Sequence, residues 1–157
     1  MKTYIINPDT NKPVSIEDWQ KDSDPTRAEI LLIETDSARL LMRKSYLPGE
    51  HTFDESQKAC AAFRPAGMDG ITFRCPTRKE CIDIYDARHI GGLDEAIKLT
   101  KGDYAKRGRY HWTADRDVDP DYAAYYAWFS YGYGGCMDYV GMYSTNLAVP
   151  VALLTTL

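Results

Sequence analysis

The sequence has no excess of basic residues and no long apolar segment. Its 157 residues carry 19 Lys and Arg against 23 Asp and Glu, which gives a formal net charge of -4 at pH 7. Proteins that bind duplex nucleic acid neutralise runs of phosphates with basic side chains, so this balance argues against nucleic acid as a partner. The longest wholly apolar stretch, residues 147–154, is far shorter than the roughly 20 residues that span a bilayer. We therefore expect no membrane span.

The N-terminus also lacks the features of a secretory signal. Residues 1–9 contain one Lys and only the aliphatic pair Ile5 and Ile6, where a signal peptide needs about 7 to 15 apolar residues. The sequence thus predicts no Sec export and a cytoplasmic location in the producing cell. Association with a virion would carry the protein out of the cell on lysis. The length and the 44% content of hydrophobic residues suit a soluble globular domain.

Cysteine is scarce and shows no metal-binding spacing. There is no C-x-x-C, and the three histidines lie far apart along the chain, so no zinc site and no cofactor are expected. A chain of this size with its own core does not need disulfides. We therefore expect thiols at Cys60, Cys75, Cys81 and Cys136. No sequence motif pairs a cysteine nucleophile with a histidine base, and the chain is predicted not to be an enzyme.

The first 27 residues differ in pattern from the rest. They are polar, interrupted by Pro8, Pro13 and Pro25, and without sustained periodicity. This predicts an N-terminal arm of residues 1–27 outside a compact domain of residues 28–157, with a core that survives removal of the arm. The sizeable apolar residues of the arm are expected to dock on the domain flank or on a neighbouring copy, which favours a homo-oligomer such as a trimer. These residues are Ile5, Ile6, Val14, Ile16 and Trp19.

Helix and strand signals segregate along the remaining chain. Two apolar runs separated by the polar residues 34–37 predict a hairpin. Capping boxes that start at Thr52 and Thr77 predict helices near residues 53–64 and 78–88. Residues 93–99 form a further short turn or helix, and strand-like segments follow at residues 110–114, 123–130 and 147–154. The order of elements predicts an α+β fold. Residues on the inward stripes are expected to be buried, namely Leu32, Leu40, Phe53, Cys60, Phe63, Phe73, Ile84, Trp112, Trp128 and Val151.

Three segments in fixed order carry a family resemblance. They are F-R-C-P-T-R-K-E-C at residues 73–81, Y-H-W-T-A at residues 110–114 and A-V-P-V at residues 148–151. They resemble the C-terminal domain of Legionella collagen-like adhesins and the related Fibrobacter succinogenes major-paralogue domains, which typically read W-R-L-P-T-x-x-E-L, then Y-W-S-S-T, then V-R-P-V. The resemblance covers residues 38–154.

The resemblance implies a C-type lectin-like domain. In that fold two helices flank a small twisted antiparallel sheet, and the chain ends pair as neighbouring strands. The sequence departs from the family pattern at Phe73, where Trp is usual, at Cys75 and Cys81, where Leu is usual, and at Val149, where Arg is common. The substitutions keep apolar volume and leave the expected fold intact.

A tyrosine-rich segment follows in the C-terminal part. Residues 121–146 hold seven of the twelve tyrosines, interspersed with Gly, Ser, Asp and Asn. Binding loops have this composition, because Tyr offers large contact area at low rotamer entropy and Gly and Ser let loops adapt. An aromatic sheet in which alternate tyrosines pack the core is the other interpretation. The candidate ligand-binding residues are Tyr122, Tyr125, Tyr131, Tyr133, Asp138, Tyr139, Tyr143 and Asn146.

Together these features favour non-enzymatic recognition of a protein or glycan. C-type lectin-like domains include the variable targets of diversity-generating retroelements. Because the chain lacks an export signal yet resembles an adhesin domain, we expect a phage or prophage fibre or decoration protein, or a retroelement-diversified protein. The alternative is a structural or assembly domain of a virion or larger particle without ligand binding.

A calcium site is the less favoured interpretation of the acidic stretch at residues 115–121. Its carboxylates stand at alternate positions, but Pro120 occupies the sixth position, where Gly is needed, and Tyr126 the twelfth, where Glu is needed. We expect a solvated acidic loop there.

Overall fold

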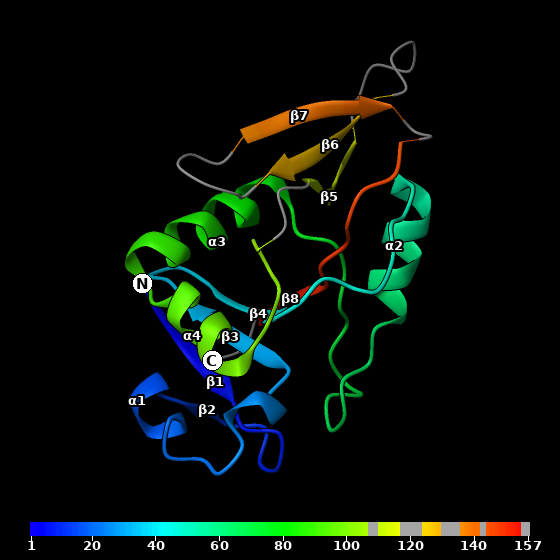
Figure 1. Cartoon of the computed structure of the whole chain (residues 1–157). Coiled ribbons are helices and arrows are strands. Elements are labelled where there is room, and N and C mark those ends of the chain that lie inside the picture. Colours follow the sequence, from blue (N-terminus) through cyan, green and yellow to red (C-terminus); the bar gives the residue numbers. More distant parts are fainter. Residues whose placement is uncertain (107–109, 117–123, 130–135, 142–143, 155–157) are drawn as a thin grey trace.

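A computed structural model describes residues 1–106, 110–116, 124–129, 136–141 and 144–154, with the backbone alone for the third and fourth of these ranges. Two antiparallel sheets, in the strand orders β2-β1-β3-β4-β8 and β5-β6-β7, lie one above the other (Figure 1). Helices α3 and α4 lie on one side of the molecule and α2 on the other (Figure 1). The predicted α+β class is confirmed.

The larger sheet consists of β2 (Pro13–Val14), β1 (Lys2–Ile6), β3 (Ile30–Glu34), β4 (Arg39–Arg43) and β8 (Val151–Leu154). The smaller sheet consists of β5 (Tyr110–Arg116), β6 (Ala124–Phe129) and β7 (Cys136–Gly141). The α-helices of the described chain are α1 (Ile16–Trp19), α2 (Phe53–Ala62), α3 (Arg78–Ile90) and α4 (Leu93–Thr100), and a 3-10 turn spans Pro25–Arg27.

Strand β3 is apolar from Ile30 to Ile33 because the larger sheet is covered on both faces. Successive side chains of a strand point to opposite faces. Leu31 and Ile33 join a buried cluster with residues of α1, α3 and α4. Ile30 and Leu32 pack on the other face in a second cluster that includes Phe73. Burial of each such side chain contributes about 1.5 to 3 kcal/mol, so this strand is the centre of the core.

The predicted hairpin and helices are present. β3 pairs with β4 with Glu34 opposite Arg39. The Oγ1 atom of Thr52 accepts a hydrogen bond from Glu55 N at 3.4 Å, and Thr77 does the same for Glu80 N at 3.2 Å. Each glutamate returns the contact to the cap N–H, so both capping boxes are confirmed. Helix α2 ends two residues before the predicted position and α3 two residues after it, and α4 confirms the third helical segment.

The predicted N-terminal arm outside the core is wrong. β1 lies inside the larger sheet and pairs with β3, with Ile5 opposite Leu31. Of the five apolar residues expected to dock, four are buried and Val14 is half-buried, all within clusters of this same chain. The sequence pattern did not show this, because β1 has only one aliphatic pair and its partner strand lies about 25 residues further along the chain.

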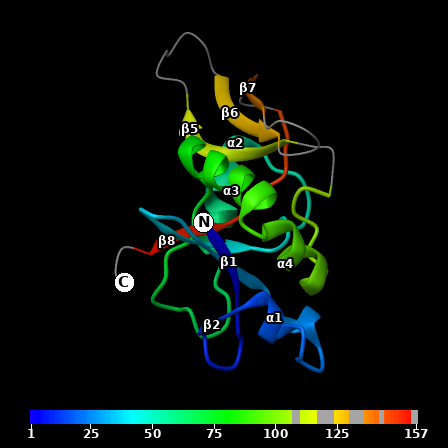
Figure 2. The ribbon, with the colours of Figure 1, turned by 90° about the vertical axis from the view of Figure 1, so that its left-hand side faces the viewer.

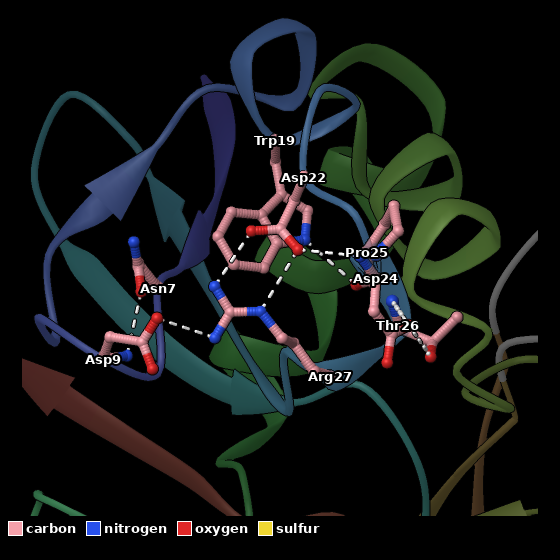
Figure 3. Close-up of polar contacts among 8 residues, drawn as sticks. All are labelled: Asn7, Asp9, Trp19, Asp22, Asp24, Pro25, Thr26 and Arg27. Carbon is pink, nitrogen blue, oxygen red and sulfur yellow. Dashed lines mark hydrogen bonds and ion pairs between the residues drawn. The ribbon is translucent and has the colours of Figure 1, made fainter.

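The chain after β1 is held by a network around Arg27 (Figure 3). The guanidinium donates to Asp9 at 2.9 Å and to both oxygens of Asp22 at 2.9 and 3.2 Å. It also lies over the ring of Trp19, 4.9 Å from the ring centroid, and the Trp19 Nε1 atom donates to the Pro25 carbonyl at 3.0 Å. The hydrogen bonds from the Arg27 guanidinium lower the pKa of the Asp22 carboxyl. Residues 7–27 are therefore fixed by specific contacts.

Most of the predicted core is buried. Eight of the ten residues are confirmed, namely Leu32, Leu40, Phe53, Cys60, Phe73, Ile84, Trp112 and Val151. Phe63 is half-buried and packs edge-on against Phe73, with ring centroids 5.1 Å apart. The side chain of Trp128 lies outside the described part of the chain.

The two ends of the region that carries the family resemblance lie side by side. β4 pairs antiparallel with β8, with Arg39 opposite Leu154. This is the terminal pairing that the resemblance implies. It agrees with a C-type lectin-like domain, which stays a prediction.

Candidate functional site

The smaller sheet carries part of the tyrosine-rich segment at one end of the molecule (Figures 1 and 2). Strands β6 and β7 pair with Tyr125 opposite Val140, Tyr126 opposite Tyr139 and Ala127 opposite Asp138. Directly opposed residues of an antiparallel pair share a face. The register therefore assigns Tyr125 and Asp138 to one face and Tyr139 to the other.

The predicted ligand-binding residues are thus distributed over both faces and the connecting segments. Four of them fall outside the described residues: Tyr122, Tyr131, Tyr133 and Tyr143. Asn146 is half-buried, its backbone pairs with His51, and its Nδ2 atom is shielded from solvent without an acceptor among the described residues. Asn146 lies where the chain passes from β7 toward β8 rather than on an open surface.

A buried anchor joins β5 to α2. Trp112 is 0% exposed, and its ring packs edge-on against Phe53, with centroids 5.6 Å apart. Its Nε1 atom donates to the carbonyl of His51 at 2.6 Å. His51 in turn exchanges two backbone hydrogen bonds with Asn146, each of 2.9 Å. One tryptophan therefore fixes β5, the start of α2 and the chain after β7 together.

A second buried group, His111, lies on the same strand. His111 is 0% exposed. Its Nδ1 atom lies 3.2 Å from the Trp112 carbonyl and its Nε2 atom 3.2 Å from the Tyr104 hydroxyl. Since a carbonyl can only accept, Nδ1 carries the proton and Nε2 accepts from Tyr104. Burial lowers the pKa of His111 to about 4, so the ring is neutral at pH 7 and supports the sheet as a hydrogen-bonded core residue.

The acidic stretch at residues 115–121 begins at the end of β5 with Asp115, which contacts the start of a helix. The Oδ2 atom of Asp115 accepts from the backbone N–H of Arg78, the first residue of α3, at 2.7 Å, and lies 3.6 Å from Arg78 Nε. An acidic group at a helix N-terminus is stabilising. The other three aspartates of the candidate calcium loop, Asp117, Asp119 and Asp121, lie outside the described residues. Within the described ranges, no group of three or more His, Cys, Asp or Glu residues is placed to hold a metal ion.

The motif residues at positions 74–80 have structural roles. The Arg74 guanidinium makes two hydrogen bonds of 2.7 Å to the Glu80 carboxylate, which also accepts from Thr77 N at 2.7 Å. Burial favours a higher pKa for Glu80, but the donors from Arg74 and Thr77 outweigh it and lower the pKa. The backbone of Arg74 exchanges two hydrogen bonds with Val151 on β8. These residues join α3 to the larger sheet.

A separate cleft of about 840 Å³ opens beside this ion pair. The turn between β3 and β4, the start of α3 and the end of β8 line it. Carboxylates outnumber cations in the lining, with Glu34, Asp36, Glu80 and Asp83 against Arg39 and Lys79. Burial raises the pKa of Asp83. Three of these carboxylates are already ion-paired, with Arg39, Lys79 and Arg74, so the lining carries little uncompensated charge. No local sequence pattern indicates this cleft, because three distant segments form it. In the sequence, residues 34–37 are visible only as a polar hairpin loop.

Neither the models of known protein families nor the curated protein sequences match this chain. Within the part of the chain that the structure describes, no helix is both long enough and apolar enough to cross a membrane.

Proposed function

We propose that the chain is a non-enzymatic recognition module, in which residues 121–146 contact a protein or a glycan. The observation that carries the proposal is the division of the fold into two sheets. The tyrosine-rich segment contributes β6 and β7 to the smaller sheet, which lies apart from the strands of the larger sheet. Binding residues are commonly presented in this way, on segments that a rigid scaffold positions.

The buried contacts of β5 and α3 support this interpretation. Packing or hydrogen bonds inside the fold engage Trp112, His111 and Glu80, which gives these residues structural roles. The tyrosine-rich segment, by contrast, has the composition of a binding surface. His111 is fully buried, and both of its ring nitrogens are already bound, to Trp112 and to Tyr104. The ring is therefore not exposed to a substrate, which supports recognition rather than catalysis.

The proposed setting is a phage or prophage fibre or decoration protein with a C-type lectin-like domain. The resemblance at residues 38–154 and the pairing of β4 with β8 support this setting. In a homo-oligomer, several tyrosine-rich surfaces would bind at once, and this avidity would raise the overall affinity above that of a single weak surface. The alternative, an assembly domain without a ligand, remains an outcome of the test below.

The test is binding of the fluorescently labelled full chain to intact bacteria from a panel of species and to a printed glycan array. A variant that combines Tyr131→Ser, Tyr133→Ser and Tyr139→Ser should lose binding by tenfold or more, equivalent to at least about 1.4 kcal/mol. Tyr4→Ser, on β1 of the larger sheet, is the matched control and should bind as the parent chain does.

Two results would contradict the proposal. Absence of saturable binding to every cell type and glycan would favour the assembly role. Undiminished binding by the triple variant, with its fold confirmed by circular dichroism, would place the contact elsewhere in the chain, with the cleft beside α3 as the next surface to test.

A further inference from the structure

Two cysteines face each other in a small buried cluster beneath β5. Cys60 is on the last part of α2 and Cys75 lies just before α3, and both are 0% exposed. Their Sγ atoms are 3.5 Å apart. The buried cluster is completed by Ala148, with Leu47 and Ala114 packed against it.

We propose that Cys60 and Cys75 are a covalent modification site, a dithiol that closes to an intramolecular disulfide under oxidising conditions. A disulfide needs an S–S distance of about 2.05 Å, so the sulfur atoms have to approach by about 1.5 Å. The proposal requires that side-chain rotation within the cluster close this gap. The two cysteines are 15 residues apart, and the bond would close that loop between α2 and the start of α3.

The surroundings distinguish the roles of the two sulfurs. The hydrogen bond between the two sulfurs lowers the pKa of Cys75, with further contributions from Ser56, Gln57 and the charge of Arg74, although burial opposes them. The same hydrogen bond and burial raise the pKa of Cys60. Cys75 therefore ionises first. The thiolate is the form of cysteine that reacts.

With hydrogen peroxide as the oxidant, the reaction balances in two steps. The Cys75 thiolate attacks one peroxide oxygen, the O–O bond breaks, and the departing hydroxide takes up the thiol proton as water, which leaves a sulfenic acid. The Cys60 sulfur then attacks the Cys75 sulfur and displaces hydroxide, which leaves as a second water with the Cys60 proton. Two thiols and one peroxide thus give one disulfide and two waters.

The pair suits a protein that is made in a reducing compartment and acts outside it. Thiols persist in the cytosol, and disulfides persist in oxidising surroundings. Both sulfurs are fully buried, so the oxidant reaches them through local opening of the fold. Closure would hold α2 and the segment before α3 together at the base of the smaller sheet.

The experiment equilibrates the folded full chain in glutathione buffers of increasing oxidised fraction, traps remaining thiols with N-ethylmaleimide, and maps linkages by mass spectrometry of proteolytic peptides. We expect one dominant linkage, between Cys60 and Cys75. The melting temperature of the oxidised chain should exceed that of the reduced chain by about 6 to 12 °C, as a 15-residue loop predicts for a domain of this size.

Substitutions separate this pair from the other cysteines. Cys60→Ser and Cys75→Ser should each abolish both the linkage and the shift in melting temperature. Cys81→Ser is the matched control, since Cys81 is equally buried on α3, and it should leave both unchanged. Because the chain is brought to equilibrium with the buffer, the fraction of linked chains does not depend on how slowly the oxidant reaches the buried sulfurs.

The proposal is overturned if fewer than a tenth of the chains carry the Cys60–Cys75 linkage in the most oxidising buffer. It is also overturned if mixed disulfides with glutathione accumulate in place of that linkage, or if Cys81→Ser removes it.

Discussion

The two sheets are stabilised in different ways. The larger sheet is covered on both faces by aliphatic and aromatic side chains, so that β3 is buried from Ile30 to Ile33. β5, the strand of the smaller sheet whose side chains are described, is held by Trp112 against α2 and by the hydrogen-bonded His111. The comparison indicates that the larger sheet holds the fold by extensive burial, whereas β5, within the described part of the smaller sheet, is positioned by a few buried anchors.

Helix α3 connects the two regions. It contacts β1 of the larger sheet and both β5 and β6 of the smaller one, and Figure 2 shows it between them. Its first turn receives Asp115 from the end of β5, and its Glu80 receives Arg74 from the segment that pairs with β8. The smaller sheet is therefore attached to the core at defined points rather than through a flexible linker.

Removal of residues 1–27 should have the largest effect. It takes β1 and β2 from the larger sheet and removes buried Ile5 and Trp19. We expect the truncated chain to lose cooperative thermal unfolding, as monitored by circular dichroism. A cooperative transition retained in the truncated chain would show that the larger sheet does not depend on β1.

Trp112→Ala should come next, with a loss of about 3 to 5 kcal/mol in the free energy of unfolding, because a fully buried aromatic side chain is removed. Urea denaturation measures the loss. Hydrogen exchange sharpens the comparison, since β5 amides should lose protection while β3 amides keep it. Equal loss of protection in both strands would mean that the sheets unfold as one unit.

The pH dependence of stability should reveal His111. Its folded pKa of about 4 lies below the unfolded value of about 6.5. Above pH 6.5 neither state binds the proton. As pH falls from 6.5 to 4, the unfolded state binds it first, so the free energy of unfolding falls by about 2 to 3 kcal/mol.

The control for that measurement is His111→Asn, followed by urea denaturation across the same pH range. This variant should lack the contribution of His111, so the parent chain should lose more stability than the variant between pH 6.5 and 4. Parallel pH profiles would show that His111 is accessible to protons in the folded state.

Loss of a helix cap should have the smallest effect, and the effect should be equal for α2 and α3. Thr52→Ala and Thr77→Ala each remove the oxygen that accepts a backbone N–H, at a cost of about 1 kcal/mol. Thr→Ser at each position keeps the oxygen and should cost less than half as much. Melting temperatures measure all four variants. If serine is no better than alanine, the methyl group and not the cap accounts for the loss.

The sequence predicted the elements whose signals are local. Thr52 and Thr77 marked the two helix starts correctly, because a capping box lies within four residues. The hairpin was recognised because β3 and β4 are separated by a four-residue polar turn. β1 was missed, since its stability comes from pairing with a strand far along the chain and from contacts of Trp19 and Arg27 that no local pattern shows.

The candidate site was predictable in composition but not in arrangement. The tyrosine content of residues 121–146 is visible in the sequence, whereas the register that places Tyr125 and Asp138 on the same face depends on how β6 pairs with β7. Likewise, the juxtaposition of Cys60 with Cys75 and the cleft beside α3 arise from segments brought together only by folding.

The most direct test of the difference between the sheets is a proteolysis-based stability scan of every single substitution in residues 28–43 and residues 121–146. We predict that the median loss in free energy of unfolding in the first window exceeds that in the second by at least about 1 kcal/mol, the size of an average destabilising substitution. Equal medians in the two windows would contradict the account, because the tyrosine-rich segment would then be packing the core.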